Sequence, residues 1–182
     1  MKKDTIKNIK KDIPIANYDE RSGCFQLSDT SYADIYMINP KDLVNGDPDD
    51  IERDCFTWAK FYKTYGMDIE IIGMMFPCDT GQQHAYWKKL AEKNTNPEFE
   101  AMIRRKVSEL EFRKRNTLRK EFFLICFWEN LEEIRNGRKT LESTLGIKRV
   151  ESGMTTELLS EIPKKKKLQV LFKFANKNSQ IF

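Results

Sequence analysis

The side chains best suited to chemistry in this chain are basic, and they gather in two parts of the sequence. One part is an uninterrupted run of four lysines, and the other lies between residues 104 and 120. Such clusters can neutralise the phosphates of a nucleic acid or the headgroups of anionic lipids. The candidate contacts with an anionic partner are Lys164, Lys165, Lys166, Lys167, Arg104, Arg105, Arg113 and Arg115. The alternative is a set of solvated faces, balanced in the second part by neighbouring glutamates.

The single histidine, His84, follows Cys78 at a spacing that could bring two ligands to one metal ion. A metal site needs further His, Cys or acidic ligands, and the sequence indicates none. A Cys78 nucleophile with His84 as its base would lack a third residue to orient the base. We therefore assign no metal ligand and no catalytic residue, and interpret His84 as an exposed polar residue beside a helix start.

The acidic residues Asp49, Asp50, Glu52 and Asp54 fall in the first turns of a predicted helix, where the helix dipole alone favours acids. Phosphate-binding loops of the Walker type place lysine after glycine, and none of the eight glycines is followed by lysine. The pattern GxGxxG is also absent from the sequence. We expect no cofactor, and we expect that the protein is not an enzyme.

With 182 residues, of which 40% are hydrophobic, the chain can form one domain of good size. Residues 1–12 are polar and lysine-rich and are interpreted as a flexible basic arm, which leaves residues 13–178 as a single α+β domain. The net charge is +4, and no stretch approaches the roughly 18 apolar residues of a membrane span. The N-terminus also lacks the apolar core of a signal peptide. These features predict a cytoplasmic protein.

The four cysteines are far apart and form no CxxC pair. Cys55 and Cys126 lie on faces that are predicted to be core, where thiols behave as small hydrophobic groups. A disulfide framework is not expected in a chain of this size and composition.

The elements that position the basic residues begin with a hairpin, predicted from the apolar segments Phe25 to Leu27 and Tyr32 to Ile38. A helix then starts at Pro48, with Asp47 as its cap, and stops at Gly66. Its apolar stripe is expected to comprise Ile51, Cys55, Trp58, Tyr62 and Tyr65.

An alternating strand follows from Met67 to Phe76, and Pro77 ends it. Two helices come next, over residues 82–93 and from Pro97. The second helix is expected to bury Phe99, Ile103, Val107 and Leu110 while its other faces carry the arginines.

Seven consecutive apolar residues, Phe122 to Trp128, predict a strand covered on both faces. A helix with a capping box starts at Asn130, residues 147–151 suggest a short strand, and residues 164–175 fit either a strand or a helix, with the helix favoured. Two strand–helix–strand units joined by an insertion predict an α+β fold. We expect a ferredoxin-like split βαβ sandwich with an N-terminal β-hairpin and an inserted helix pair.

This order of elements resembles the N-terminal domain of the ATPases of conjugative type IV secretion systems, of the VirB/TraE/TrsE type. The matching segments are IPIANYDERSGCFQLSDTSYADIYMI, DIERDCFTWAKFYKTYGMDIEIIGMM and NPEFEAMIRRKVSELEFRKRNTLRKEFFLICFW, within residues 13–178. The ATPase domain that follows in this family, with its Walker motifs, does not occur in the sequence. The resemblance therefore implies a free-standing relative, similar to TrsD/TraD-type transfer proteins, to which no catalytic residue can be carried over.

In that family the domain lies near the cytoplasmic face of the membrane, contacts small membrane components of the channel and helps the ATPases to assemble. The resemblance thus implies a non-enzymatic adaptor of a conjugative DNA-transfer machine. Its expected partners are the conjugation ATPase, a small membrane channel component and an anionic membrane surface, so a peripheral location at the inner face of the membrane is also expected. The alternative is an accessory protein of plasmid transfer that binds nucleic acid through the basic residues.

Overall fold

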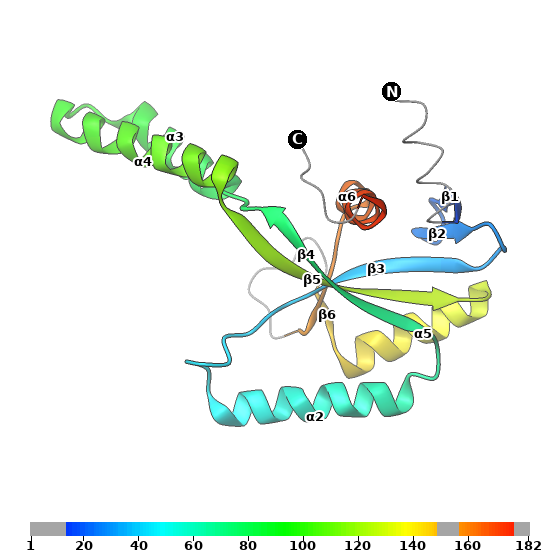
Figure 1. Ribbon diagram of the computed structural model, residues 1–182. Coiled ribbons are helices and arrows are strands. Elements are labelled where there is room, and N and C mark those ends of the chain that lie inside the picture. Colours follow the sequence, from blue (N-terminus) through cyan, green and yellow to red (C-terminus); the bar gives the residue numbers. More distant parts are fainter. Residues whose placement is uncertain (1–13, 149–156, 177–182) are drawn as a thin grey trace. The chain divides into compact units, whose positions relative to one another are not determined.

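The computed structural model describes residues 14–148 and 157–176, which form seven strands and five helices (Figure 1). The chain divides into two compact units. We call the first the sheet unit; it comprises residues 1–74 and 121–182. We call the second, Met75–Lys120, the helix-pair unit. The predicted basic arm and most of the predicted strand at 147–151 lie outside the described residues.

The predicted α+β fold is confirmed, because the central strands have the ferredoxin-like order. In sequence the core elements are β3 (Tyr32–Ile38), α2 (Pro48–Thr64), β4 (Ile69–Pro77), β5 (Leu118–Trp128), α5 (Leu131–Thr144) and β7 (Leu159–Glu161). In space β5 lies between β3 and β4, and β7 pairs with β3 on its other side. The order β7-β3-β5-β4 is that of the split βαβ sandwich. Phe122–Trp128 is therefore an inner strand, as predicted.

The N-terminal hairpin has one more strand than the sequence pattern indicated. Strand β1 (Ile15–Asp19) precedes β2 (Cys24–Leu27), and the two pair antiparallel. Its residues are mostly polar or half-exposed, so they carry no apolar alternation. Strand β2 then joins the start of β3 through the pairs Phe25–Ala33 and Gln26–Tyr32. Strand β6 (Ile147–Lys148) is short and runs parallel to β7.

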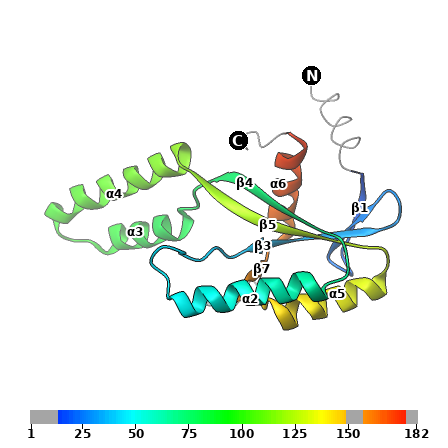
Figure 2. The ribbon, with the colours of Figure 1, turned by 60° about the horizontal axis from the view of Figure 1, so that its bottom comes forward.

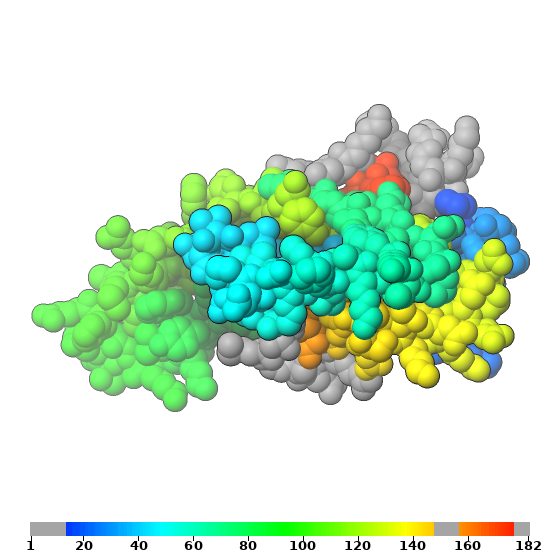
Figure 3. Space-filling model, turned by 90° about the horizontal axis from the view of Figure 1, so that it is seen from below, coloured from blue at the N-terminus to red at the C-terminus, as the bar shows by residue number. Residues whose placement is uncertain are grey.

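Helices α2 and α5 lie side by side on one face of the sheet, which Figure 3 shows from outside. Helix α2 starts where predicted, with the Asp47 side chain accepting from the Asp49 N–H at 2.9 Å. Its predicted stripe was wrong at two positions, since Cys55 and Tyr62 are exposed. Tyr65 is buried as predicted, together with Phe61, which the predicted stripe did not include. The buried side therefore has helical spacing but is rotated relative to the predicted one.

Helix α5 packs very closely on the sheet at Gly137. A Cβ atom at that position would lie 2.3 Å from the Trp128 Nε1 atom, so only glycine allows this approach. The same Trp128 N–H donates to the Tyr65 hydroxyl at 3.0 Å. Asn130 caps the helix as predicted, by accepting from the N–H groups of Glu132 and Glu133. The α2/α5 face is consequently the main apolar core, and it includes the predicted core residue Cys126.

Helix α6 (Lys164–Ala175) covers part of the opposite face of the sheet (Figure 2). The helix favoured for residues 164–175 is therefore confirmed. Leu171 and Phe174 of α6 line a cavity of about 170 Å³ together with Ala33, Ile35 and Ile125 of the sheet. The α6 face thus has unfilled space beside Ala33.

The helix-pair unit contains α3 (Gly81–Lys93) and α4 (Pro97–Asn116), which confirms the predicted insertion. The Asn96 side chain caps α4 by accepting from the Glu98 N–H at 3.0 Å. Ile103 and Leu110 are buried as predicted, but Phe99 is 52% exposed. Phe99 lies in the first turn of α4, and the prediction that it belongs to the buried stripe was wrong.

Candidate partner-binding surfaces

A buried cluster of charges joins the sheet to the helices on both of its faces. Asp34 of β3 is only 2% exposed. Its Oδ2 atom accepts from Arg138 Nη2 of α5 at 2.9 Å, and its Oδ1 atom is paired with Lys167 Nζ of α6. Since α5 and α6 cover opposite faces, one carboxylate holds both helices. Charged groups are almost never fully buried without such partners.

The cluster fills a gap in the hydrogen bonding of β3. On the side of β3 away from β5, pairing with β2 reaches Ala33 and pairing with β7 starts at Tyr36, so neither of these two strands covers Ile35. The Ile35 N–H donates to the Asp34 carboxylate at 2.8 Å instead. Buried backbone donors need a partner, and the side chain supplies it here. Lys167 also donates to the Gly23 carbonyl at 3.1 Å, which ties α6 to the start of β2.

The other groups around this cluster are held in their neutral forms. Arg138 contacts Cys24 Sγ at 3.2 Å and the Tyr36 hydroxyl at 3.3 Å. Burial, reinforced by the charge of Asp34, raises the pKa of the Cys24 thiol to about 11 and the pKa of Tyr36 well above its ordinary value. A thiol is nucleophilic only as its thiolate, so Cys24 is inert near neutral pH. These contacts hold β2, β3, α5 and α6 together, so the role of the cluster is structural.

Three of the four predicted lysine contacts are engaged within the chain. Lys164 pairs with Glu20 and lies 4.3 Å from the Tyr18 ring centre, while Lys166 pairs with Glu121 at 2.6 Å. Lys167 is buried against Asp34, so it cannot reach a partner, and this correction removes it from the candidate contacts. Acids from other parts of the chain thus balance the positive charges at the start of α6. Lys165 is exposed and has no ion pair with any residue that the structure describes.

The predicted arginine contacts all lie on α4 and are exposed, but they differ in their pairing. Arg104 pairs with Glu100 at 2.5 Å and Arg105 with Glu109 at 3.3 Å, both one helical turn away. Exposed pairs of this kind contribute little to stability. Arg113 and Arg115, in the last turn, form no ion pair within the described ranges. The unpaired positive charge of α4 is therefore at its C-terminal end.

Large apolar side chains accompany these arginines on the surface of the helix-pair unit. None of the residues of α3 is buried. Phe112, which precedes Arg113, is 65% exposed. The exposed large apolar residues of this unit are Tyr86, Leu90, Phe99, Met102, Phe112 and Leu118. These exposed apolar groups are candidates for contact with another molecule.

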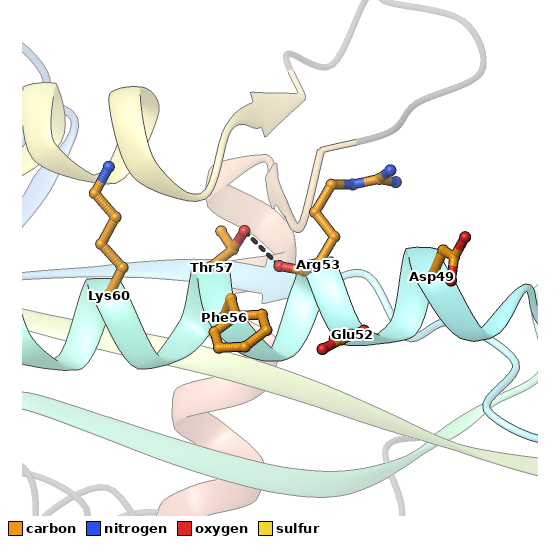
Figure 4. Close-up of a pocket in the computed structure, with 6 residues that line it drawn as sticks. All are labelled: Asp49, Glu52, Arg53, Phe56, Thr57 and Lys60. Atoms are coloured by element: carbon orange, nitrogen blue, oxygen red, sulfur yellow. Dashed lines mark hydrogen bonds between the residues drawn. The ribbon is translucent and has the colours of Figure 1, made fainter.

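A shallow hollow on the outer side of α2 is lined mainly by charged residues. Figure 4 shows its lining, in which Asp49, Glu52, Arg53 and Lys60 carry charges of both signs around Phe56. The acids predicted to favour the helix start, Asp49 and Asp50, lie in the first turn and are exposed. Mixed charges on an exposed helix face are those of an ordinary solvated surface.

The structure adds no third ligand to the pair Cys78 and His84. Over residues 14–148 and 157–176, no three His, Cys, Asp or Glu side chains are grouped so that they could hold a metal ion. His84 is only partly exposed, and its Nε2 atom is buried without a hydrogen-bond partner, so the expectation of an exposed histidine was wrong. In the same ranges no helix is long and apolar enough to cross a membrane.

Sequence reasoning missed the buried cluster, although one signal was present. The strand YADIYMI contains a single charged residue, Asp34, between apolar neighbours. A lone acid in a strand with this burial requires a cation. Its cations, however, are 104 and 133 residues away in sequence, and no local pattern links them.

Comparison with known proteins gives one result at the level of the family. Searches of curated proteins and of solved structures returned no match. Residues 17–176, from β1 to the end of α6, match the family described as the archaeal TraC-like domain. This family is related to conjugation, whereas the narrower VirB/TraE/TrsE resemblance is not part of the match. The chain therefore belongs to the archaeal TraC-like domain family.

Proposed function

We propose that this chain is a non-enzymatic docking component of a conjugative DNA-transfer machine. The observation that carries the proposal is the exposed apolar and basic surface of the helix-pair unit. The family assignment supplies the setting, because the TraC-like domain is conjugation-related. The partner is the transfer ATPase or a small membrane component of the channel.

The composition of this surface fits a protein partner. Aromatic residues and arginine dominate the binding energy of protein interfaces, and Phe112, Arg113 and Arg115 combine both types at one helix end. Met102 adds a flexible apolar contact on the same helix. A partner surface with an apolar pocket rimmed by acids would be complementary to it.

Peripheral contact with an anionic membrane is a second part of the proposal. Lys165 points its charge to solvent at the start of α6, and Leu168 and Phe172 of the same helix are exposed. One lysine near an anionic surface contributes about 1 kcal/mol, which is weak by itself. Membrane contact would therefore reinforce docking and would not replace it.

The experiment measures binding of the purified protein to the transfer ATPase that is encoded by the same mobile genetic element. The Phe112→Ala and Arg113→Gln double variant should bind at least about tenfold more weakly, as expected when an interface hot spot is lost. Phe56→Ala on α2 is the matched control, since Phe56 is equally exposed but lies on a solvated face. Both variants should keep the wild-type melting temperature.

Two outcomes would overturn the proposal. One is unchanged ATPase and membrane-component binding in the double variant. The other is binding of mixed-sequence DNA that weakens steeply with salt and disappears in the same variant, because a steep salt dependence indicates phosphate contacts. That result would favour the nucleic-acid-binding alternative.

A further inference from the structure

Within the described residues the sheet ends in three outer strands, β1, β4 and the two-residue β6, and the free edges of the two longer strands are built differently. An outer strand presents unpaired N–H and C=O groups that can pair with another strand. Proteins usually block such edges with short strands, proline, bulges or charges. Whether an edge is blocked therefore indicates whether it can accept a partner.

The β1 edge is blocked in several ways. Strand β1 has only five residues, and Pro14 immediately precedes it. Its register with β2 shifts between Ile15 and Asn17, which is a bulge or an irregularity of the ladder. Both its shortness and its irregular pairing disfavour the addition of a further strand.

Strand β4 is longer, with nine residues, of which Ile69 to Met74 belong to the sheet unit. The segment reads IEIIGM, with one charge and without lysine or proline. Ile71 is 45% exposed although it belongs to a strand. No strand follows β4 in the sheet that the described residues form.

The outward backbone groups of β4 can be identified from its junction with β5. The Asp68 carbonyl accepts from the Phe127 N–H at 3.0 Å, so Asp68 faces β5. Successive residues of a strand direct their backbone groups to opposite sides. Ile69, Ile71 and Gly73 therefore direct theirs away from β5, towards the free edge.

We infer that β4 pairs with β4 of a second copy of this chain, antiparallel and around a twofold axis at Ile71. In this register Ile71 faces its own copy, Ile69 faces Gly73, and Glu70 faces Ile72. No acid is opposite an acid, and two half-exposed isoleucines pair across the axis. A self-complementary edge of this kind forms a closed twofold dimer. The proposal is independent of the proposed docking function.

The register can be tested by cysteine cross-linking in a Cys55→Ser, Cys78→Ser background, which leaves the buried Cys24 and Cys126. Ile71→Cys should form a covalent dimer under mild oxidation, because the two copies of residue 71 are directly opposite. Ile69→Cys is the matched control in the same strand. Its two copies would be offset by four residues, about 14 Å at 3.4 Å per residue, beyond the reach of a disulfide at about 7 Å.

The second measurement is molar mass by light scattering over a range of concentrations. The wild-type chain should reach twice its 21.5 kDa mass, and Ile71→Lys should raise the dissociation constant at least about tenfold. Tyr62→Lys, at an exposed site on α2, should behave as wild type. Equal cross-linking through residues 69 and 71 would overturn the inference. A wild-type chain that stays monomeric up to about 1 mM would also overturn it, even if β4 binds a strand of another protein.

Discussion

The two faces of the sheet are closed by different interactions. On the α2/α5 face, apolar side chains pack closely, and Trp128 fills the space that Gly137 leaves. On the α6 face, a helix with four lysines in its first turn is held through charges, and a cavity of about 170 Å³ lies beneath its other end. Asp34 belongs to both arrangements because it binds Arg138 and Lys167.

This difference indicates where the fold tolerates change. At Gly137 the α2/α5 face leaves no room for added volume, whereas the α6 face has room beside Ala33. Loss of a buried charge, in contrast, should affect both faces together. The following predictions use stability of the purified protein to separate these cases.

The largest effect is expected for Asp34→Ala. The substitution leaves Arg138 and Lys167 without their shared carboxylate, and removing one partner of a buried ion pair costs about 3–5 kcal/mol. Urea unfolding measures the loss. Lys167→Met should cost less, because the Asp34–Arg138 pair survives, and Glu52→Ala on the exposed side of α2 should stay within about 0.5 kcal/mol. Equal stabilities of Asp34→Ala and Glu52→Ala would show that the cluster contributes nothing.

Gly137→Ala should reduce the free energy of unfolding by about 1–3 kcal/mol, although alanine favours helices. The added methyl group would lie 2.3 Å from Trp128 Nε1 and would displace the ring that donates to Tyr65. Gly66→Ala is the control, since an added Cβ there meets no atom within 4 Å. If thermal melting ranks the two variants equally, the α2/α5 face is not closely packed at Trp128.

Alkaline pH should destabilise the protein through its buried thiols. Burial raises the pKa of Cys24 to about 11 and of Cys126 to about 12, from an ordinary value near 9. Between these values the unfolded chain has lost protons that the folded chain retains, so stability is full below about pH 9 and falls as pH rises. Each thiol should contribute a loss of about 1.4 kcal/mol per pH unit in that range. Urea midpoints at pH 8, 9 and 10 measure the slope, which Cys24→Ser should reduce and Cys55→Ser should leave unchanged.

The smallest effect is expected for Ala33→Val, and its sign is opposite. Ala33 lines the cavity beneath α6, and valine favours strands. Filling part of the cavity should raise the free energy of unfolding by about 0.5–1 kcal/mol, measured by urea unfolding. A loss as large as that of Gly137→Ala would mean that the two faces are equally tightly packed.

Local sequence patterns predicted most helices and strands of this fold, but few of the long-range contacts that hold them together. The starts of α2 and α5 followed from Asp47 and Asn130, because capping involves residues only two or three positions apart. The apolar run in β5 predicted an inner strand, because it too is a pattern of residues that are adjacent in sequence. Strand β1 was missed because its side chains are too polar and exposed to alternate clearly.

The lysine run shows why the candidate contacts were harder to predict. Four adjacent lysines at a helix start are unfavourable locally, and an external anion was a reasonable explanation. The acids that balance three of them are Glu20, Asp34 and Glu121, which come from three separate parts of the chain. Only the tertiary structure brings these groups together. Arg113 and Arg115 of α4 have no such partners among the residues that the structure describes, and the role of the exposed α4 arginines stays a prediction.

The position of β3 between distant partners also has a consequence for how the chain folds. Strand β3 pairs with β5, and Ile35 is about ninety positions before its partner Ile125. Asp34 of β3 forms its ion pair with Lys167, which is 133 positions later in the sequence. Contacts of such long range slow folding, because a large loop must close before they form. During synthesis, at about 5–20 residues per second, the β3 edge would stay incomplete for many seconds after it leaves the ribosome. The helix pair, whose residues are neighbours in sequence, can form during that interval.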